Sequence, residues 1–483
     1  MLHLPPRRTA ATAAALVLSL LPALANAAAA PLPGKDCHLP GIEEALRCVR
    51  LDVPLDYDKP GATLSLHVTV APALRESARR DPLFVLAGGP GEAGSDLVPL
   101  LNAAFRKVRA TRDVVLIDQR GTGLSGKLDC EADDKNEETA SEEEQVAEAR
   151  ACITKLNKPY ARYTTEAAAR DIDRVRQSLG YHQVNIWGGS YGTRLGQAYA
   201  RLFPQRVRAM VLDGVAAPDQ IVPAGGRDAQ AALDKLFQQC AEDQPCAATF
   251  PALRQEFNAI VAKLNKGAQT LELPDPRTAE LRQVRMTSNR FLGTVHNILY
   301  SQQDSRRLPF LIHSAYQNRW QPFIARSNIA RDFATDGGPA TPLHLAVVCA
   351  EDFPRLTPAL LVEDTRDSFL GKPQIDRIGT LCESMQVPAV PWSTPAKIEA
   401  PVLMLSGALD PVTPPRRAEA AAKYMTHAQH LIIDNAGHIV TPLGCAPRLL
   451  REFLDQPGSK VAGECLKEIP APTFQLNSAG PQP

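Results

Sequence analysis

Short, almost wholly apolar runs recur in the first and the last parts of the chain, and each ends at glycine or a charged residue. Such runs are typical of strands that are buried on both faces, as in a parallel sheet. Six are found, at residues 83–87, 114–117, 184–187, 208–214, 401–407 and 430–433. With two earlier segments at 49–53 and 64–71, the second of which alternates like an edge strand, the pattern predicts a mostly parallel eight-stranded sheet.

The pattern changes between residues 216 and 397. Apolar residues there recur at helical spacing, for example at 231–264, 281–300 and 308–316, and no series of buried strands appears. We therefore expect flanking helices around the sheet and a large, mainly helical cap inserted before the strand at 401–407. This divides the chain into core at 28–215, cap at 216–397, core again at 398–470 and a tail at 471–483. The C-terminal end is expected to be poorly ordered from Lys467 onward.

A Gly-x-Ser-x-Gly motif follows the strand at 184–187, and a helical segment at 194–200 follows the motif. Strand, sharp turn and helix are the context of a nucleophile elbow, in which a strained serine projects its hydroxyl. Gly188 and Gly192 leave room for strand and helix to approach closely. The alternative is a simple Gly/Ser turn after a buried strand. The context favours Ser190 as a nucleophile.

An acid and a histidine follow the serine, each just beyond a predicted strand. They are Asp410 and His438, and because the carboxyl ends of parallel strands share one edge of a sheet, all three should meet there. Serine, acid and histidine in this chain order are typical of the α/β-hydrolase fold. In such a triad His438 takes the serine proton and Asp410 orients the imidazole. Asp434 is the competing acid, but it lies at the end of the last strand, from which His438 is awkward to reach.

The loop after the strand at 83–87 reads Gly88-Gly89-Pro90-Gly91. A serine nucleophile needs backbone N–H donors for the negative oxygen of the tetrahedral intermediate. One comes from the residue after the serine, Tyr191, and the other from this loop, where Gly88 or Gly89 is placed to supply it. A phosphate-binding loop is the alternative, but neither phosphate-loop glycine pattern is present.

Together these motifs resemble the prolyl iminopeptidase and tripeptidyl aminopeptidase family of α/β-hydrolases, over roughly residues 45–470. The resemblance rests on Gly88-Gly89-Pro90-Gly91, Asp118-x-Arg120-Gly121-x-Gly123-x-Ser125, Gly188-Gly189-Ser190-Tyr191-Gly192 and Gly437-His438. It is closer to the secreted tripeptidyl branch at Val53-Pro54-Leu55-Asp56-Tyr57 and at Gly407-x-x-Asp410-x-x-Thr413-Pro414. Ala87 stands where prolyl iminopeptidases usually carry histidine.

The resemblance implies release of residues from a free peptide N-terminus, and therefore recognition of an ammonium group. A partly desolvated carboxylate in the cap could bind it through charge-assisted hydrogen bonds. Residues 347–352 resemble a Cys-x-x-Asp stretch in the cap of that branch, so Glu351, with Asp352 beside it, is the expected substrate-binding pair. The alternative for these acids is a salt bridge or a helix cap.

The chain begins like an exported protein. Arg7 and Arg8 precede an apolar stretch at 10–24, and Ala25-Asn26-Ala27 offers small residues for a signal peptidase, so residues 1–27 are predicted to be a signal peptide. A membrane anchor is the alternative, but the stretch is short and broken by Pro22. The protein is expected in the periplasm or outside the cell, with no membrane span after cleavage.

All ten cysteines follow that segment, and an even number in an exported chain favours disulfides. Pairing between sequence neighbours predicts the bridges 37–48, 130–152, 240–246, 349–382 and 445–465; free buried thiols are the alternative. No zinc-like spacing occurs, and neither a metal nor a cofactor is implied.

The chain has 483 residues and a formal net charge of zero, with no basic stripe that would suggest nucleic acid. We expect a monomeric exported serine aminopeptidase whose partners are small peptides with a free N-terminus. An esterase or amidase acting on small acyl groups, a strict prolyl iminopeptidase, and a catalytically inert binding protein are the alternatives.

Overall fold

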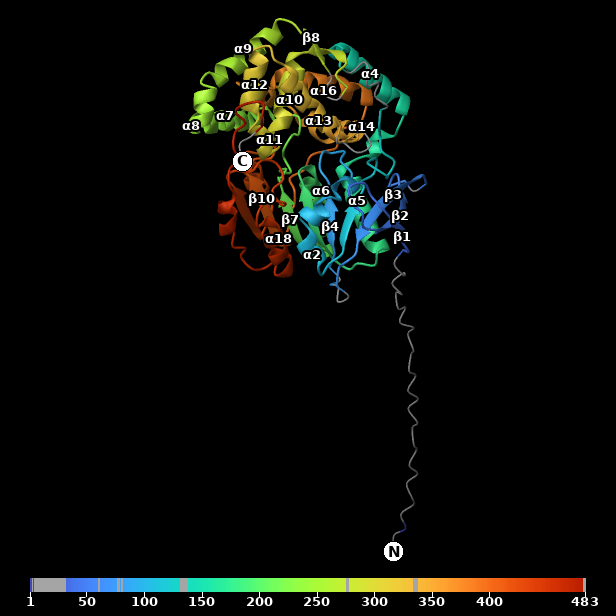
Figure 1. The fold of residues 1–483 in the computed structure, drawn as a ribbon. Helices are drawn as coiled ribbons and strands as arrows, with labels where there is room; N and C mark the ends of the chain where they lie inside the picture. Colours follow the sequence, from blue (N-terminus) through green and yellow to red (C-terminus); the bar gives the residue numbers. More distant parts are fainter. Residues whose placement is uncertain are drawn as a thin grey trace.

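The computed structural model describes residues 32–59, 61–75, 81–130, 138–274, 278–332 and 338–480, together with Met1, His3 and Arg79. The predicted signal peptide therefore lies outside the described residues, apart from Met1 and His3. Within the described part, helices and strands alternate along the chain, and one large sheet runs through the molecule (Figure 1).

The sheet has nine strands in the order β1-β2-β3-β5-β4-β6-β7-β10-β11. Strands β1 to β3 and the β3–β5 pair are antiparallel, and the pairs from β5 across to β11 are parallel. The prediction of a mostly parallel sheet is confirmed, but the predicted number of strands, eight, is one too few. The strand that the pattern missed is β1, which has only three residues and pairs with β2. The bounds are β1 Lys35–Cys37, β2 Leu46–Pro54, β3 Thr63–Ala71, β4 Leu83–Leu86, β5 Val114–Ile117, β6 Val184–Gly189, β7 Val207–Asp213, β10 Val402–Gly407 and β11 Ala428–Ile433.

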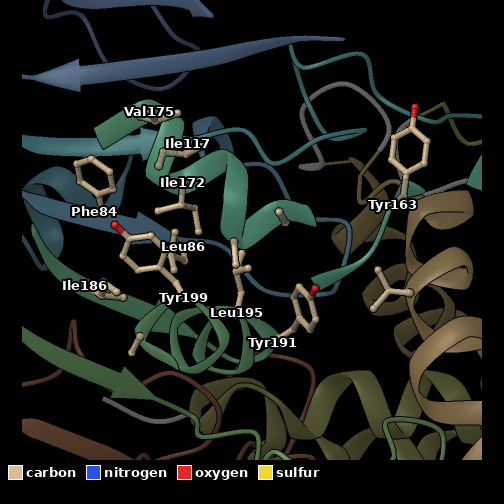
Figure 2. Close-up of a cluster of buried hydrophobic side chains, with 14 of the residues drawn as sticks. Phe84, Leu86, Ile117, Tyr163, Ile172, Val175, Ile186, Tyr191, Leu195 and Tyr199 are labelled. Carbon is tan, nitrogen blue, oxygen red and sulfur yellow. The ribbon is translucent and has the colours of Figure 1, made fainter. Parts of the chain in front are cut away.

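Helices cover both faces of the sheet, because successive side chains of a buried strand point to opposite sides. Phe84 and Leu86 of β4 pack with helices α5 (Thr165–Ser178) and α6 (Tyr191–Leu202), as Figure 2 shows. Leu83 and Val85 pack on the other side, in the cluster of α2 (Arg106–Arg109) and α18 (Ala446–Asp455). The core also contains the helices α1 (Leu100–Ala103) and α17 (Pro415–Ala422).

A second layer of helices lies over one edge of the sheet (Figure 1). Its own core is rich in aromatic rings, with Phe257 and Phe323 each packed against Phe291. We call this layer the cap; the boundaries at 216 and 397 stay predictions. Its helices are α7 Gly226–Glu242, α8 Gln244–Thr249, α9 Leu253–Asn265, α10 Ser288–Leu299, α11 Gln302–Ser305, α12 Leu308–Tyr316, α13 Gln321–Asp332, α14 Thr341–Val347, α15 Pro358–Thr365 and α16 Gly371–Met385.

The cap also holds a hairpin that the helical pattern did not predict. Strand β8 (Gln269–Pro274) pairs antiparallel with β9 (Leu281–Met286), so the helix expected at 281–300 begins only after Thr287, whose side chain caps α10. Val284 and Met286 are buried at alternate positions, as in a strand. Pairing of β9 with β8 decided the conformation, and an apolar count within one segment cannot detect such pairing.

Two further segments join the cap from elsewhere in the chain. Helix α4 (Glu142–Leu156) comes from the N-terminal part but packs against α16, and the side chain of Asn289 donates to Glu142 Oε2 at 2.6 Å. The C-terminal end is not the expected poorly ordered tail, since Phe474 is 5% exposed inside the aromatic core of the cap. The N–H of Gln475 donates to the carbonyl of Arg306 at 3.1 Å.

All five predicted disulfides are present, and no described cysteine is free. The bridge 349–382 is of most interest for the site, because it ties α16 to a π-helical turn, Val348–Asp352, that follows α14. That turn carries the predicted substrate-binding acids.

Candidate active site

Ser190 stands at the turn between β6 and α6 with φ 55° and ψ −125°, a strained conformation for a residue with a side chain. The glycines around it are required by close packing. A Cβ on Gly192 would lie 2.1 Å from the carbonyl oxygen of Leu86, and one on Gly188 would lie 2.5 Å from the carbonyl oxygen of Gly192. The turn therefore has the geometry of a nucleophile elbow.

His438 and Asp410 form a buried pair at the carboxyl edge of the sheet. Nδ1 of His438 lies 2.7 Å from Oδ2 of Asp410, so Nδ1 carries the proton and Nε2 is left as the base. Asp410 also accepts the N–H groups of Val412 and Thr413 and the Thr413 hydroxyl. Asp434 is exposed, and of the two candidate acids Asp410 is the one that contacts the imidazole of His438.

Burial alone would lower the pKa of His438, but the neighbouring Asp410 outweighs this effect, and the pKa of His438 is raised above 6.5. Burial alone would likewise raise the pKa of Asp410, yet His438 and the surrounding donors lower it. The pair is therefore suited to stabilise an imidazolium, which forms when the serine proton is taken. No hydrogen bond joins the Ser190 and His438 side chains among the described residues, as is common before substrate binds.

Asp213, which sequence reasoning did not single out, connects the two halves of the site. It is fully buried at the end of β7. Its carbonyl accepts the N–H of Ser190, and its carboxylate accepts the N–H groups of Val440 and Thr441, two and three residues after the histidine. A charged residue at the carboxyl end of the strand next to the elbow strand was the available signal.

The cap reaches the histidine through Tyr300. Its carbonyl accepts the N–H of His438 at 2.8 Å, and its ring stands edge-on to the imidazole, with centroids 5.1 Å apart. Gly437 is needed here, because a Cβ would lie 2.4 Å from that carbonyl oxygen. His296 also packs edge-on against the Tyr300 ring, with centroids 5.4 Å apart, and burial lowers the pKa of His296 to about 4, so it remains neutral.

The three predicted oxyanion donors differ in the structure. Tyr191 is the first residue of α6, so its N–H has no acceptor within the helix. The N–H of Gly88, in contrast, donates to Oε2 of Glu92 at 2.9 Å. As long as this bond is kept, Gly88 cannot serve as the second donor, and Gly89 is the remaining glycine of the predicted pair.

The predicted substrate-binding acids are not gathered with the triad. Asp352 is fully buried, and its oxygens accept from Arg194 and Arg355, so this acid is already paired. Glu351 accepts the backbone N–H and the hydroxyl of Thr165, both at 2.6 Å.

Glu351 lines a cavity of about 480 Å³ whose walls include none of Ser190, Asp410 and His438. The hydroxyl of Thr165 also contacts the Tyr191 hydroxyl at 2.7 Å. Glu351 is thus connected, through Thr165, to the hydroxyl end of the Tyr191 side chain, and Tyr191 is the residue that follows the nucleophile.

Arg120 and Asp171 form a buried ion pair that braces the loop after β5, as is usual for charges at the end of a strand.

Among the described residues, no group of histidine, cysteine, aspartate and glutamate side chains could hold a metal ion. In that same part of the chain, no helix has the length and apolar content needed to cross a membrane.

The chain is similar to several curated proteins. Serine protease Hip1 of Mycobacterium tuberculosis is 27% identical over 428 residues, which cover 81% of each chain. Tripeptidyl aminopeptidase of Streptomyces lividans is 31% identical over 245 residues, 47% of this chain and 43% of that protein. Carboxylesterase B of Mycobacterium tuberculosis is 36% identical over 191 residues, 36% of each.

Solved structures also match, among them a proline iminopeptidase of Mycobacterium smegmatis at 15% identity and a TM-score of 0.37, over 85% of this chain and 99% of that one. The family model described as alpha/beta hydrolase fold matches residues 81–443, three-quarters of the chain. The protein is therefore a member of the alpha/beta hydrolase family.

Proposed function

We propose that the protein is an exported serine aminopeptidase, which releases N-terminal residues or short units from peptides through an acyl-enzyme on Ser190. The observation that carries this proposal is the strained serine at the same sheet edge as the buried His438–Asp410 pair. This arrangement supports acyl transfer from an ester or an amide.

The chemistry follows from the contacts. Nε2 of His438 takes the hydroxyl proton as Ser190 attacks the scissile carbonyl, and Asp410 stabilises the imidazolium. The N–H groups of Tyr191 and Gly89 bind the developing oxyanion. His438 then gives its proton to the leaving amine, and the acyl-enzyme forms. Water, activated by the same imidazole, hydrolyses it and frees Ser190.

The names of the relatives favour a peptidase over an esterase. The match to Hip1, named a serine protease, extends over 81% of the chain, whereas the match to the carboxylesterase covers 36%. An esterase or amidase on small acyl groups is the second candidate, because the same triad serves both reactions.

Export is supported by the disulfides and by the predicted signal peptide. Five bridges among ten cysteines are typical of proteins in an oxidising compartment. N-terminal sequencing of protein recovered from the periplasm or the medium tests this part. Cleavage after Ala27 is expected, and an intact N-terminus in the cytoplasm would contradict it.

The activity itself is tested with purified mature protein and a series of 4-nitroanilides: prolyl, alanyl, dialanyl and trialanyl, each free and N-acetylated, plus a short acyl ester. S190A is the blank. Cleavage of the free-amine anilides that S190A abolishes is the expected result. Cleavage of the ester alone, or indifference to acetylation, would move the assignment to the esterase.

A further inference from the structure

Glu92 stands beside the nucleophile on the loop that follows β4. A Cβ placed on Gly88 would lie 3.0 Å from Cβ of Ser190 and 3.3 Å from Oε2 of Glu92, so the two side chains flank the same glycine. Oε2 accepts the N–H of Gly88 at 2.9 Å, which holds the carboxylate beside that glycine. No step of the proposed mechanism uses this carboxylate.

Among the described residues no lysine or arginine pairs with Glu92. Burial and the nearby Asp96 raise the pKa of this carboxyl group, while the Gly88 N–H and His438 lower it. The cap covers the loop from above, with the N–H of Ala340 donating to the carbonyl of Gly91 and with His344 against that of Pro90. A partly desolvated carboxylate without a counter-ion is costly, and a cationic ligand would offset that cost.

The position of Glu92 determines how many substrate residues can lie between a bound N-terminus and the attacked carbonyl. In a peptide the α-nitrogen lies about 2.5 Å from the carbonyl carbon of the same residue. The attacking oxygen approaches that carbon to about 3 Å, so the ammonium of the residue under attack lies within roughly 5 Å of Ser190 Oγ. Each further residue moves the N-terminus about 3.5 Å away. A carboxylate adjacent to Ser190 therefore fits the ammonium of the attacked residue itself.

We propose that Glu92 binds the α-ammonium group of the residue whose carbonyl Ser190 attacks, so that one N-terminal residue is released per cut. This proposal rests on the aminopeptidase function proposed above and adds the number of residues that are released per cut. Glu351 is the rival carboxylate. It is connected to the residue after the nucleophile through Thr165 and the Tyr191 hydroxyl, and it lines a cavity whose walls include no residue of the triad, so binding there would favour release of a longer unit.

The test compares three isosteric variants. E92Q keeps an acceptor for the Gly88 N–H and removes only the charge, so the loop is preserved. E351Q removes the charge of the rival carboxylate. E452Q removes a charge at an exposed position of α18, where the side chain of Glu452 is 49% exposed, and serves as the control. Each is assayed on alanyl and trialanyl 4-nitroanilide, free and N-acetylated, and the products from an unmodified pentapeptide are identified by mass spectrometry.

The wild type is expected to release single residues from the pentapeptide. E92Q should raise KM for alanyl anilide about ten- to a hundredfold, the effect of losing one charge-assisted contact, and leave N-acetylated substrates unchanged. Release of intact tripeptides, a selective loss in E351Q instead of E92Q, or an equal change on free and blocked substrates would overturn the assignment. In all three cases the aminopeptidase proposal would survive; it fails if the wild type cleaves no peptide in a Ser190-dependent way, or if it cleaves free and N-acetylated substrates equally well.

Discussion

Asp213 holds Ser190 in place from the neighbouring strand: its carbonyl oxygen accepts the N–H of the nucleophile at 2.9 Å. The carboxylate of the same residue accepts the N–H groups of Val440 and Thr441 at 2.7–3.0 Å, so one fully buried side chain sets the histidine loop relative to the elbow. The distance between nucleophile and base depends on a residue that takes no part in the chemistry.

D213N should therefore impair catalysis through geometry. An amide can accept at one oxygen but turns an NH₂ group toward an N–H donor, which leaves at least one buried donor unpaired, at about 1–3 kcal/mol. We expect a lower Tm and a loss of at least tenfold in kcat/KM, together with slower labelling by a fluorophosphonate. Unchanged labelling and activity would show that the loop is held by other contacts.

The pH dependence of catalysis should show the raised pKa of His438. The imidazole must be neutral to accept the serine proton, and a raised pKa keeps it protonated to higher pH. Activity should therefore rise with pH through a midpoint above 6.5, measured as kcat/KM under pseudo-first-order conditions. D410N removes the group that raises this pKa, so the residual activity should show its midpoint at lower pH. A midpoint well below 6.5 in the wild type would contradict the assignment.

The Arg194–Asp352 pair joins helix α6 to the cap and is buried on both sides. Removal of one partner leaves an uncompensated buried charge, and D352N should lower the free energy of unfolding by about 3–5 kcal/mol. The double variant R194M/D352L removes both charges and leaves Arg355 as the one former partner still charged; because the Arg355 side chain is 16% exposed and reaches solvent, the double variant should recover part of that loss. Urea unfolding of the three proteins gives the comparison; a double variant no more stable than D352N would argue that the two residues are not coupled.

The C-terminal segment should stabilise the cap. Phe474 is buried among cap aromatics and lies under the guanidinium of Arg306, 4.4 Å from the ring centroid. F474A should cost roughly 3 kcal/mol. Truncation after residue 470 should have a similar effect, visible as a lower Tm or as easier proteolysis between α10 and α13. A truncated protein as stable as the full chain would mean that the docked segment contributes nothing to stability.

Much of the site was determined by the sequence alone. Local chemistry sufficed for Ser190, because Gly188 and Gly192 have to be glycine where strand and helix meet within van der Waals distance. The six buried strands were found because a strand covered on both faces is apolar throughout. Asp410 and His438 followed from chain order, and the disulfides from pairing of neighbouring cysteines. All of these are features that one segment, or two adjacent segments, encode.

Only the tertiary structure decided which groups meet across the chain. The packing of α4 on α16 depends on a distant partner, and the burial of Phe474 depends on a cap that folds from other residues. The sequence does not show that Asp352 is paired, and only the structure shows that Arg194 and Arg355 donate to it. Glu92 reads as a loop residue until the elbow sets Ser190 beside it. A residue's charge is local, but its counter-ion and its desolvation are set by the fold, so roles that depend on them become visible only in three dimensions.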